Sequence, residues 1–450
     1  MEALLPLRQR VIRASIWSLG GFGISQIIRF GGNLLMTRLL TPDMFGIMAV
    51  ATVVMSTLAV LSDLGLRQNV IQSRRGDDHA FLNTIWTIQI MRGVQLALAT
   101  LGVAGLIATA QHYGLIIASS VYADGRAPYI VAAVSVGMAI SGFTSTKIFQ
   151  ASRNLQLKLV VQIEIPAQIV ALLVMLAWIA INRSIWALVA GGIASAIATT
   201  CLSHAILSGH RNRFEWDKSA VREVIQFGKW ILVGSIIGAF IANFDRLLLA
   251  GMTDPATLGI YAIAFNLYLV TEQLLMRAVS GIGFPAISEI ARNRPDRLKT
   301  AYYKLHGIVA TAAYFGFGLL SLFAPRLISI LYDARYADAG WMLQILSVGL
   351  LQLPSQLALQ TFLALNRPKL NTAINSLRLA IMLCAMPIGF AAMGLRGALI
   401  GLVTSSVIPV FAIAFCSVRM RFFDWRRELI PLPAIAFGML AGKLLLLLLG

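Results

Sequence analysis

The chain has 450 residues, of which 58% are hydrophobic and only 12% are charged. A soluble domain of this length carries about twice that charged fraction, so the composition excludes a soluble globular protein. The formal net charge of +18 raises the question of a nucleic-acid partner, which depends on where the basic residues lie.

Apolar runs long enough to cross a bilayer recur along the whole chain. A spanning helix needs about 20 residues, because the hydrocarbon core is about 30 Å thick. Residues 1–13 precede the first run and mix leucines with arginines, which predicts a short amphipathic stub. We expect twelve core transmembrane helices and a further C-terminal hydrophobic segment, at residues 14–39, 43–66, 81–109, 128–150, 160–181, 184–207, 226–250, 256–283, 305–331, 340–365, 371–393, 396–418 and 430–449.

The loops between these helices differ in charge on the two sides. With the N-terminus placed in the cytoplasm, the inner segments hold most of the 37 lysines and arginines, and the outer loops hold few. This asymmetry is typical of inner-membrane proteins. We therefore predict a multi-pass protein of the bacterial inner membrane with a cytoplasmic N-terminus. Its basic loops would contact membrane lipids, and we expect no nucleic-acid partner.

An internal repeat organises the chain. Residues 14–51 repeat without a gap at residues 227–264, and the segment TPDMFGIMAVA from Thr41 aligns with DPATLGIYAIA from Asp254. Each copy is an apolar helix, a turn containing proline and a second apolar helix. Duplicated sets of membrane helices are typical of carriers whose binding site lies where the two halves meet.

Six helices precede the start of the second copy, so both copies begin on the same side of the membrane. We expect an all-α fold of two parallel six-helix bundles around a central cavity, which would work by alternating access. The expected parts are the N-terminal bundle at 14–207, a cytoplasmic linker at 208–225, the C-terminal bundle at 226–418, and a basic loop with an extra hydrophobic segment at 419–450.

Several predicted helices carry arginine together with side-chain amides at bilayer depth. A charge there costs about 2.5–3.5 kcal/mol on insertion scales, so each one indicates a function. A guanidinium binds phosphate through a planar fork of donors, and amides bind hydroxyl-rich groups. A cavity with both would suit a sugar chain attached to a phosphate or pyrophosphate. The alternative is that each arginine snorkels or pairs within its bundle. The candidate substrate-binding residues are Arg29, Arg92, Arg277, Arg378, Gln26, Asn33, Asn266 and Gln273.

Acidic residues within the predicted helices are few. Glu272 lies midway along its helix, and Asp245 adjoins Arg246. Both acids are candidates for coupling to Na⁺ or H⁺, although Asp245 and Arg246 also suit a purely structural pair. The sequence has no Gly-rich nucleotide loop, no HExxH motif and no histidine pair at metal-ligand spacing. We therefore expect no cofactor and no enzymatic activity.

The stretch SQIIRFGGNLLMTRLLTPDMFGIMAVATVVMSTLAVLSDLGLRQNVIQ, which begins at Ser25, resembles the polysaccharide transporter family. This family comprises the O-antigen, capsule and exopolysaccharide flippases of the multidrug/oligosaccharidyl-lipid/polysaccharide exporter superfamily. The resemblance implies a flippase that moves an undecaprenyl-pyrophosphate-linked oligosaccharide from the cytoplasmic to the periplasmic leaflet. It also implies glycosyltransferases and a polysaccharide polymerase as partners.

Three alternatives stay open at this point. Peptidoglycan-precursor flippases resemble the chain but keep an arginine on helix 2, whereas this chain has none between Asp43 and Leu66. A multidrug or cation antiporter of the same superfamily would need acidic residues in its cavity. A membrane glycan polymerase or ligase, a different class, tends to have a large outer loop, and the outer loops here are short.

Overall fold

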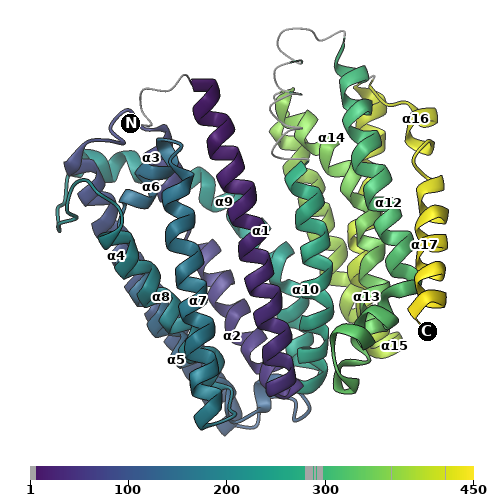
Figure 1. Cartoon of the computed structure of the whole chain (residues 1–450), viewed down its shortest axis with the longest axis horizontal. Coiled ribbons are helices and arrows are strands. Elements are labelled where there is room, and N and C mark those ends of the chain that lie inside the picture. Colours follow the sequence, from purple (N-terminus) through teal and green to yellow (C-terminus); the bar gives the residue numbers. More distant parts are fainter. Residues whose placement is uncertain are drawn as a thin grey trace. The chain divides into compact units, whose positions relative to one another are not determined.

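The computed structural model describes residues 7–278, 287, 290, 297–365, 367–420 and 422–449. Every regular element in these residues is helical (Figure 1). Within the described residues, ten helices are long and apolar enough to cross a membrane, or eleven if one bent pair counts as a single span. The all-helical, multi-pass prediction is confirmed, whereas the arrangement of twelve core helices plus one stays a prediction.

The first half of the chain follows the predicted spans with three differences. The helix at the first predicted span, 14–39, is not among the ten that are apolar enough to cross a membrane. The first helix begins at Leu7, inside the predicted stub. The predicted span 128–150 is a pair of helices bent by 64°. The elements are α1 (Leu7–Leu39), α2 (Pro42–Leu61), α3 (Leu66–Gln72), α4 (His79–His112), η2 (Val121–Ala123), α5 (Ala127–Gly142), α6 (Lys147–Arg153), α7 (Leu157–Ile181) and α8 (Trp186–Ala205).

The bend between α5 and α6 frees backbone carbonyl groups that a straight helix would use internally. The side-chain amide of Gln89, on α4, donates to the carbonyl oxygens of Gly142 at 2.9 Å and Thr144 at 2.8 Å. Gln89 therefore stabilises the bend, a role that its position in the sequence does not reveal.

The second half contains α9 (Lys218–Met252), α10 (Pro255–Ala278), α12 (Leu298–Leu331), η5 (Ala334–Tyr336), α13 (Ala339–Ser347), η6 (Val348–Gln352), α14 (Leu353–Ala364), α15 (Pro368–Arg419), α16 (Trp425–Leu429) and α17 (Pro433–Leu449). The predicted span 340–365 is divided among α13, η6 and α14. The predicted spans 371–393 and 396–418 are two segments of α15 that meet at a break. Gly394 has a φ of 60° at this break, a conformation that glycine adopts without steric cost.

Both copies of the repeat form the same local unit. In each copy a long helix ends in a short turn, and the next helix begins with proline, at Pro42 in α2 and at Pro255 in α10. Proline is tolerated at this position because its missing N–H would be unpaired in the first turn anyway. The Asp254 side chain accepts a hydrogen bond from the Thr257 backbone at 3.0 Å and caps α10.

The chain divides into two compact units, and the division runs through α9. Unit 1 comprises Met1–Ala239 and Arg246–Leu258, and unit 2 comprises Phe240–Asp245 and Gly259–Gly450. In unit 1, α4 packs on α5, α5 and α7 pack on α8, and α1 packs on α7. In unit 2, α12 packs on α13 and α17, and α14 packs on α15. The predicted linker at 208–225 belongs entirely to unit 1.

Candidate functional site

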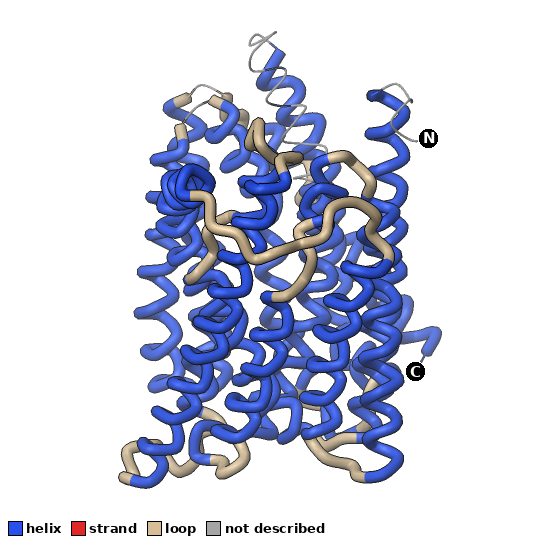
Figure 2. The backbone as a smooth tube through the Cα atoms, turned by 90° about the vertical axis from the view of Figure 1, so that its left-hand side faces the viewer, coloured by secondary structure: helices blue, strands red, loops and turns tan. Residues whose placement is uncertain are grey.

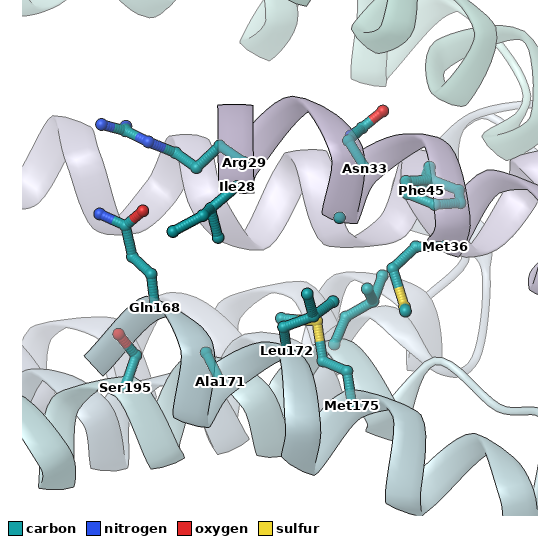
Figure 3. Close-up of a pocket in the computed structure, with 12 residues that line it drawn as sticks. Ile28, Arg29, Asn33, Met36, Phe45, Gln168, Ala171, Leu172, Met175 and Ser195 are labelled. Carbon is teal, nitrogen blue, oxygen red and sulfur yellow. The ribbon is translucent and has the colours of Figure 1, made fainter. Parts of the chain in front are cut away.

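The Arg29 side chain lies at a pocket of unit 1 enclosed by α1, α2, α7 and α8, with a volume of about 230 Å³ (Figure 3). Arg29 and Gln168 lie toward one end of the pocket, and Met36, Leu172 and Met175 lie toward the other end. Asn33 lies with Met36 and Phe45, so polar side chains line both ends of a largely apolar pocket.

Arg29 is exposed and is held by an uncharged partner. Its Nη2 donates to the Ser25 hydroxyl at 3.1 Å, and the Gln168 amide donates to the same hydroxyl at 2.7 Å. The nearby Asn33 Oδ1 is buried and has no hydrogen-bond partner in the described part of the chain. Gln26, the remaining residue of the predicted helix-1 group, is half-buried on α1.

Arg92, on α4, lines a separate cavity of about 420 Å³ among α2, α4 and α5. Its Nη2 donates to the Ala59 carbonyl at 2.6 Å, and its Nε donates to the Ser62 hydroxyl at 3.1 Å. Both partners lie at the C-terminal end of α2, where carbonyl groups lack helical partners and a cation is favoured. Arg92 thus has a structural role as a cap of α2. This contact fits the alternative that the arginine pairs within its own bundle.

Arg378 lies on the first segment of α15 in unit 2. Its Nη2 donates to the hydroxyl of Ser406, on the second segment of α15, at 3.1 Å. Its Nε is buried and, within the residues that the structure describes, makes no hydrogen bond. Arg378 therefore keeps an unused donor in the interior of unit 2.

Glu272 and Tyr268 lie one turn apart on α10, and both experience the charge of Arg378. The Tyr268 hydroxyl faces Glu272 and also Gln352 of η6, whose side chain is 3% exposed. The structure thus brings Glu272, a predicted ion-coupling residue, together with Arg378, a predicted substrate-binding residue. Tyr268 and Gln352 are not among the predicted site residues. The i, i+4 spacing of Tyr268 and Glu272 was a usable signal, whereas the position of Gln352 depends on tertiary packing.

The other predicted residues of α10 lie on a different face of the helix. Asn266 and Gln273 are exposed, and helical periodicity turns them roughly 100° or more from Glu272. The backbone of Arg277 belongs to α10, but its side chain lies outside the described residues. Among the predicted α10 residues whose side chains are described, only Glu272 therefore lies with Tyr268, Gln352 and Arg378.

Asp245, the second predicted coupling residue, is 2% exposed on α9. Its Oδ2 accepts a hydrogen bond from the hydroxyl of Tyr261, which is fully buried on α10. This bond joins the two helices of the second repeat copy and gives Asp245 a structural role.

The ion pairs in the described residues involve other side chains than the three predicted arginines. Over the described ranges, none of the ion pairs shorter than 4 Å includes Arg29, Arg92 or Arg378. Pairs are found instead at loops and helix ends, for example between Arg126 and Asp124 at 2.8 Å, where hydrogen bonding to Arg126 lowers the pKa of the Asp124 carboxyl. None of the three arginines therefore forms a direct ion pair in these ranges, although Arg378 interacts electrostatically with Glu272 and Arg92 with Asp63. No group of three or more potential metal ligands occurs in the residues described.

The helical architecture is that of a membrane transporter. An inward-facing multidrug resistance MATE family transporter of the MOP superfamily matches with a TM-score of 0.67 at 13% identity, covering 88% of this chain and 94% of that chain. The lipid II flippase MurJ, in an inward closed conformation, matches with a TM-score of 0.68 at 12% identity, covering 95% and 92%. At these identities the likeness shows the fold alone.

The chain belongs to the family of polysaccharide biosynthesis proteins, whose model matches residues 35–340. It is 21% identical over 427 residues to the lipopolysaccharide biosynthesis protein WzxC of Escherichia coli K12, covering 92% of this chain and 82% of WzxC. It is 23% identical over 338 residues to the succinoglycan biosynthesis transport protein ExoT of Rhizobium meliloti 1021, covering 73% and 63%. The family resemblance is confirmed, and the relatives and structural neighbours are transporters or flippases rather than enzymes.

Proposed function

We propose that the protein is a flippase that moves an undecaprenyl-pyrophosphate-linked oligosaccharide across the bacterial inner membrane by alternating access. One observation carries the proposal: in a member of a polysaccharide biosynthesis family, three arginines on long helices donate hydrogen bonds to hydroxyl and carbonyl groups, and in the described residues none of them forms a direct ion pair with a carboxylate. An uncompensated guanidinium in a low-dielectric site favours an anion, and a pyrophosphate is an anion with several acceptor oxygens.

In this proposal the cargo enters from the cytoplasmic leaflet, the side on which the N-terminus lies. Arg29 and Arg277, which lie in different halves of the chain, bind the pyrophosphate. Arg92 and Arg378 support them, and the side-chain amides bind sugar hydroxyls. The prenyl tail stays in lipid. Glycosyltransferases would supply the cargo, and a polymerase would consume it after release.

We further propose that Glu272 couples cargo movement to Na⁺ or H⁺. Supporting this role, Glu272 lies within a helix of membrane-spanning length and experiences the charge of Arg378. An acid in such a position is a functional-site hypothesis by default. Asp245 is the second candidate, although its bond to Tyr261 already accounts for its burial.

The proposed function is tested by Arg29→Ala in a strain that depends on this chain for surface polysaccharide. Losing a hydrogen bond to a charged group costs about 1.5–3 kcal/mol, so cargo binding should weaken by roughly 10- to 100-fold. We expect little surface polymer while the protein still inserts in the membrane. The matched control is Arg38→Ala, in the last turn of the same helix, which should retain polymer. Wild-type polymer with Arg29→Ala would remove Arg29 from the site.

Two other functions are raised by the solved structures that share this fold. Fold likeness to MurJ raises a peptidoglycan-precursor cargo, and likeness to MATE transporters raises drug export. Complementation of a strain depleted of its lipid II flippase would support the first, and increased drug resistance on expression would support the second. We expect neither result, because α2 lacks arginine and the arginine-lined pockets do not suit cationic drugs.

A further inference from the structure

The segment between α8 and α9, residues 207–217, is fixed to unit 1 and is called here the strap. Figure 2 shows it as a long irregular stretch across the near face of the helices. Three side chains in the first turns of α4, Asn83, Thr84 and Thr87, accept hydrogen bonds from its backbone. The donors are the N–H groups of Arg213 at 3.0 Å, Asp217 at 3.0 Å and Glu215 at 3.2 Å.

Both ends of the strap are also anchored. The Lys147 ammonium donates to the Leu207 carbonyl at 2.5 Å. At the other end, Arg75 pairs with Asp217 at 2.7 Å, and this hydrogen bond is the largest cause that lowers the pKa of the Asp217 carboxyl to about 2. The strap therefore has a fixed conformation and presents a defined set of side chains.

Alternate backbone N–H groups of the strap face α4, so the remaining side chains are left at the surface. Phe214 is 68% exposed and Trp216 is 52% exposed. Arg211 and Arg213 are exposed beside them, and in the described part of the chain neither forms an ion pair. The nearby Glu215 is occupied by the Asn83 amide at 2.9 Å. The strap thus presents a basic and aromatic surface.

The depth of this surface follows from the length of α4. Its 34 residues span about 51 Å at 1.5 Å per residue, whereas the hydrocarbon core is about 30 Å thick. Helix α4 is thus too long to lie wholly in the core, and we place its first turns in the headgroup layer because Asn83, Thr84 and Thr87, which bind the strap, are polar. Tryptophan is enriched in this layer, and basic residues there attract anionic lipids.

We propose that the strap binds the headgroups of anionic phospholipids in the adjacent leaflet. Arg211 and Arg213 contact lipid phosphates, and Phe214 and Trp216 lie at the boundary with the acyl chains. This lipid site is separate from the arginine sites proposed for the cargo, and it does not depend on what the cargo is.

The test uses the full chain in nanodiscs that contain phosphatidylglycerol or phosphatidylcholine brominated near the headgroup. Bromine quenches nearby tryptophan fluorescence, and the difference between the wild type and Trp216→Phe isolates the Trp216 signal. We expect at least twofold stronger quenching of Trp216 by the anionic lipid, an effect that decreases as salt is added. Arg211→Gln with Arg213→Gln should abolish the preference. Arg183→Gln, an exposed outer-loop change, should retain it.

Equal quenching by the two lipids would overturn the proposal, as would a preference that survives the double substitution. Absence of Trp216 quenching by either lipid would also overturn it, because Trp216 would then lie away from the headgroups. The double variant keeps every side chain that anchors the strap, so an unchanged thermal midpoint would show that it is folded.

Discussion

At the residue scale, the three arginines described on long helices have one kind of hydrogen-bond partner in common. Arg29 bonds to Ser25, Arg92 to Ser62 and Arg378 to Ser406. A serine hydroxyl accepts a hydrogen bond and orients the guanidinium without cancelling its charge. A carboxylate would satisfy the guanidinium more completely, and the cargo anion would then have to displace it.

Removing one of these hydroxyl groups should therefore impair export less than removing the arginine. A net hydrogen bond contributes about 0.5–1.5 kcal/mol, so Ser406→Ala should weaken cargo binding by roughly two- to tenfold, and Arg378→Ala should weaken it further. Surface polymer measured at limiting expression would report both effects. The adjacent Ser405→Ala is the matched control, because Ser405 bonds only to the Leu402 carbonyl. An equal loss in the control would indicate a packing effect.

The cluster around Glu272 gives a second expectation at this scale. If Glu272 exchanges a cation during transport, Glu272→Gln should make export independent of the Na⁺ or pH gradient, because the amide cannot titrate. Initial export rates at imposed gradients would measure this. Asp245→Asn should leave the gradient dependence intact, since Asp245 already bonds to Tyr261. Persistent dependence in Glu272→Gln would exclude Glu272 as the coupling residue.

At the scale of elements, α17 packs against α12 through small residues. A Cβ atom added at Gly438 would collide with the backbone carbonyl of Phe315, and one added at Gly318 would collide with that of Ile435. The two helices approach closely because glycine leaves their backbones uncovered, which is the usual way in which membrane helices associate.

Gly438→Val should therefore destabilise the docking of α17. Overpacking of this kind costs about 1–3 kcal/mol, and we expect a lower thermal midpoint in detergent and faster proteolysis of the C-terminal segment. Leu440→Val is the control on the same helix, because Leu440 is 63% exposed. An unchanged midpoint for Gly438→Val would contradict the close approach of α12 and α17.

At the scale of the whole molecule, the proposed cargo is negatively charged and moves outward. Each negative charge carried this way gains about 2.3 kcal/mol per 100 mV of membrane potential. Collapsing the potential at constant pH and Na⁺ should slow export, as measured by the initial rate of polymer appearance. An unchanged rate would exclude electrical drive and would leave ion exchange at Glu272 as the source of energy.

Most of the helical framework could be predicted from the sequence, because the length of an apolar run and the bilayer thickness are local constraints. The repeat, the proline turns at Pro42 and Pro255, and the intramembrane position of the arginines needed no tertiary information. The bend between α5 and α6 was missed, because the carbonyl groups freed there are satisfied by Gln89 from a different helix.

The sequence by itself therefore determined an all-helical, multi-pass membrane protein with arginines inside long helices, since hydropathy and charge are properties of each segment alone. Only the tertiary structure decided what each polar side chain contacts. It assigned Arg92 to the end of α2, placed Glu272 with Arg378, and fixed the strap to α4. These pairings join residues far apart along the chain, and they arise because packed helices must satisfy buried polar groups with whatever partner lies across the interface.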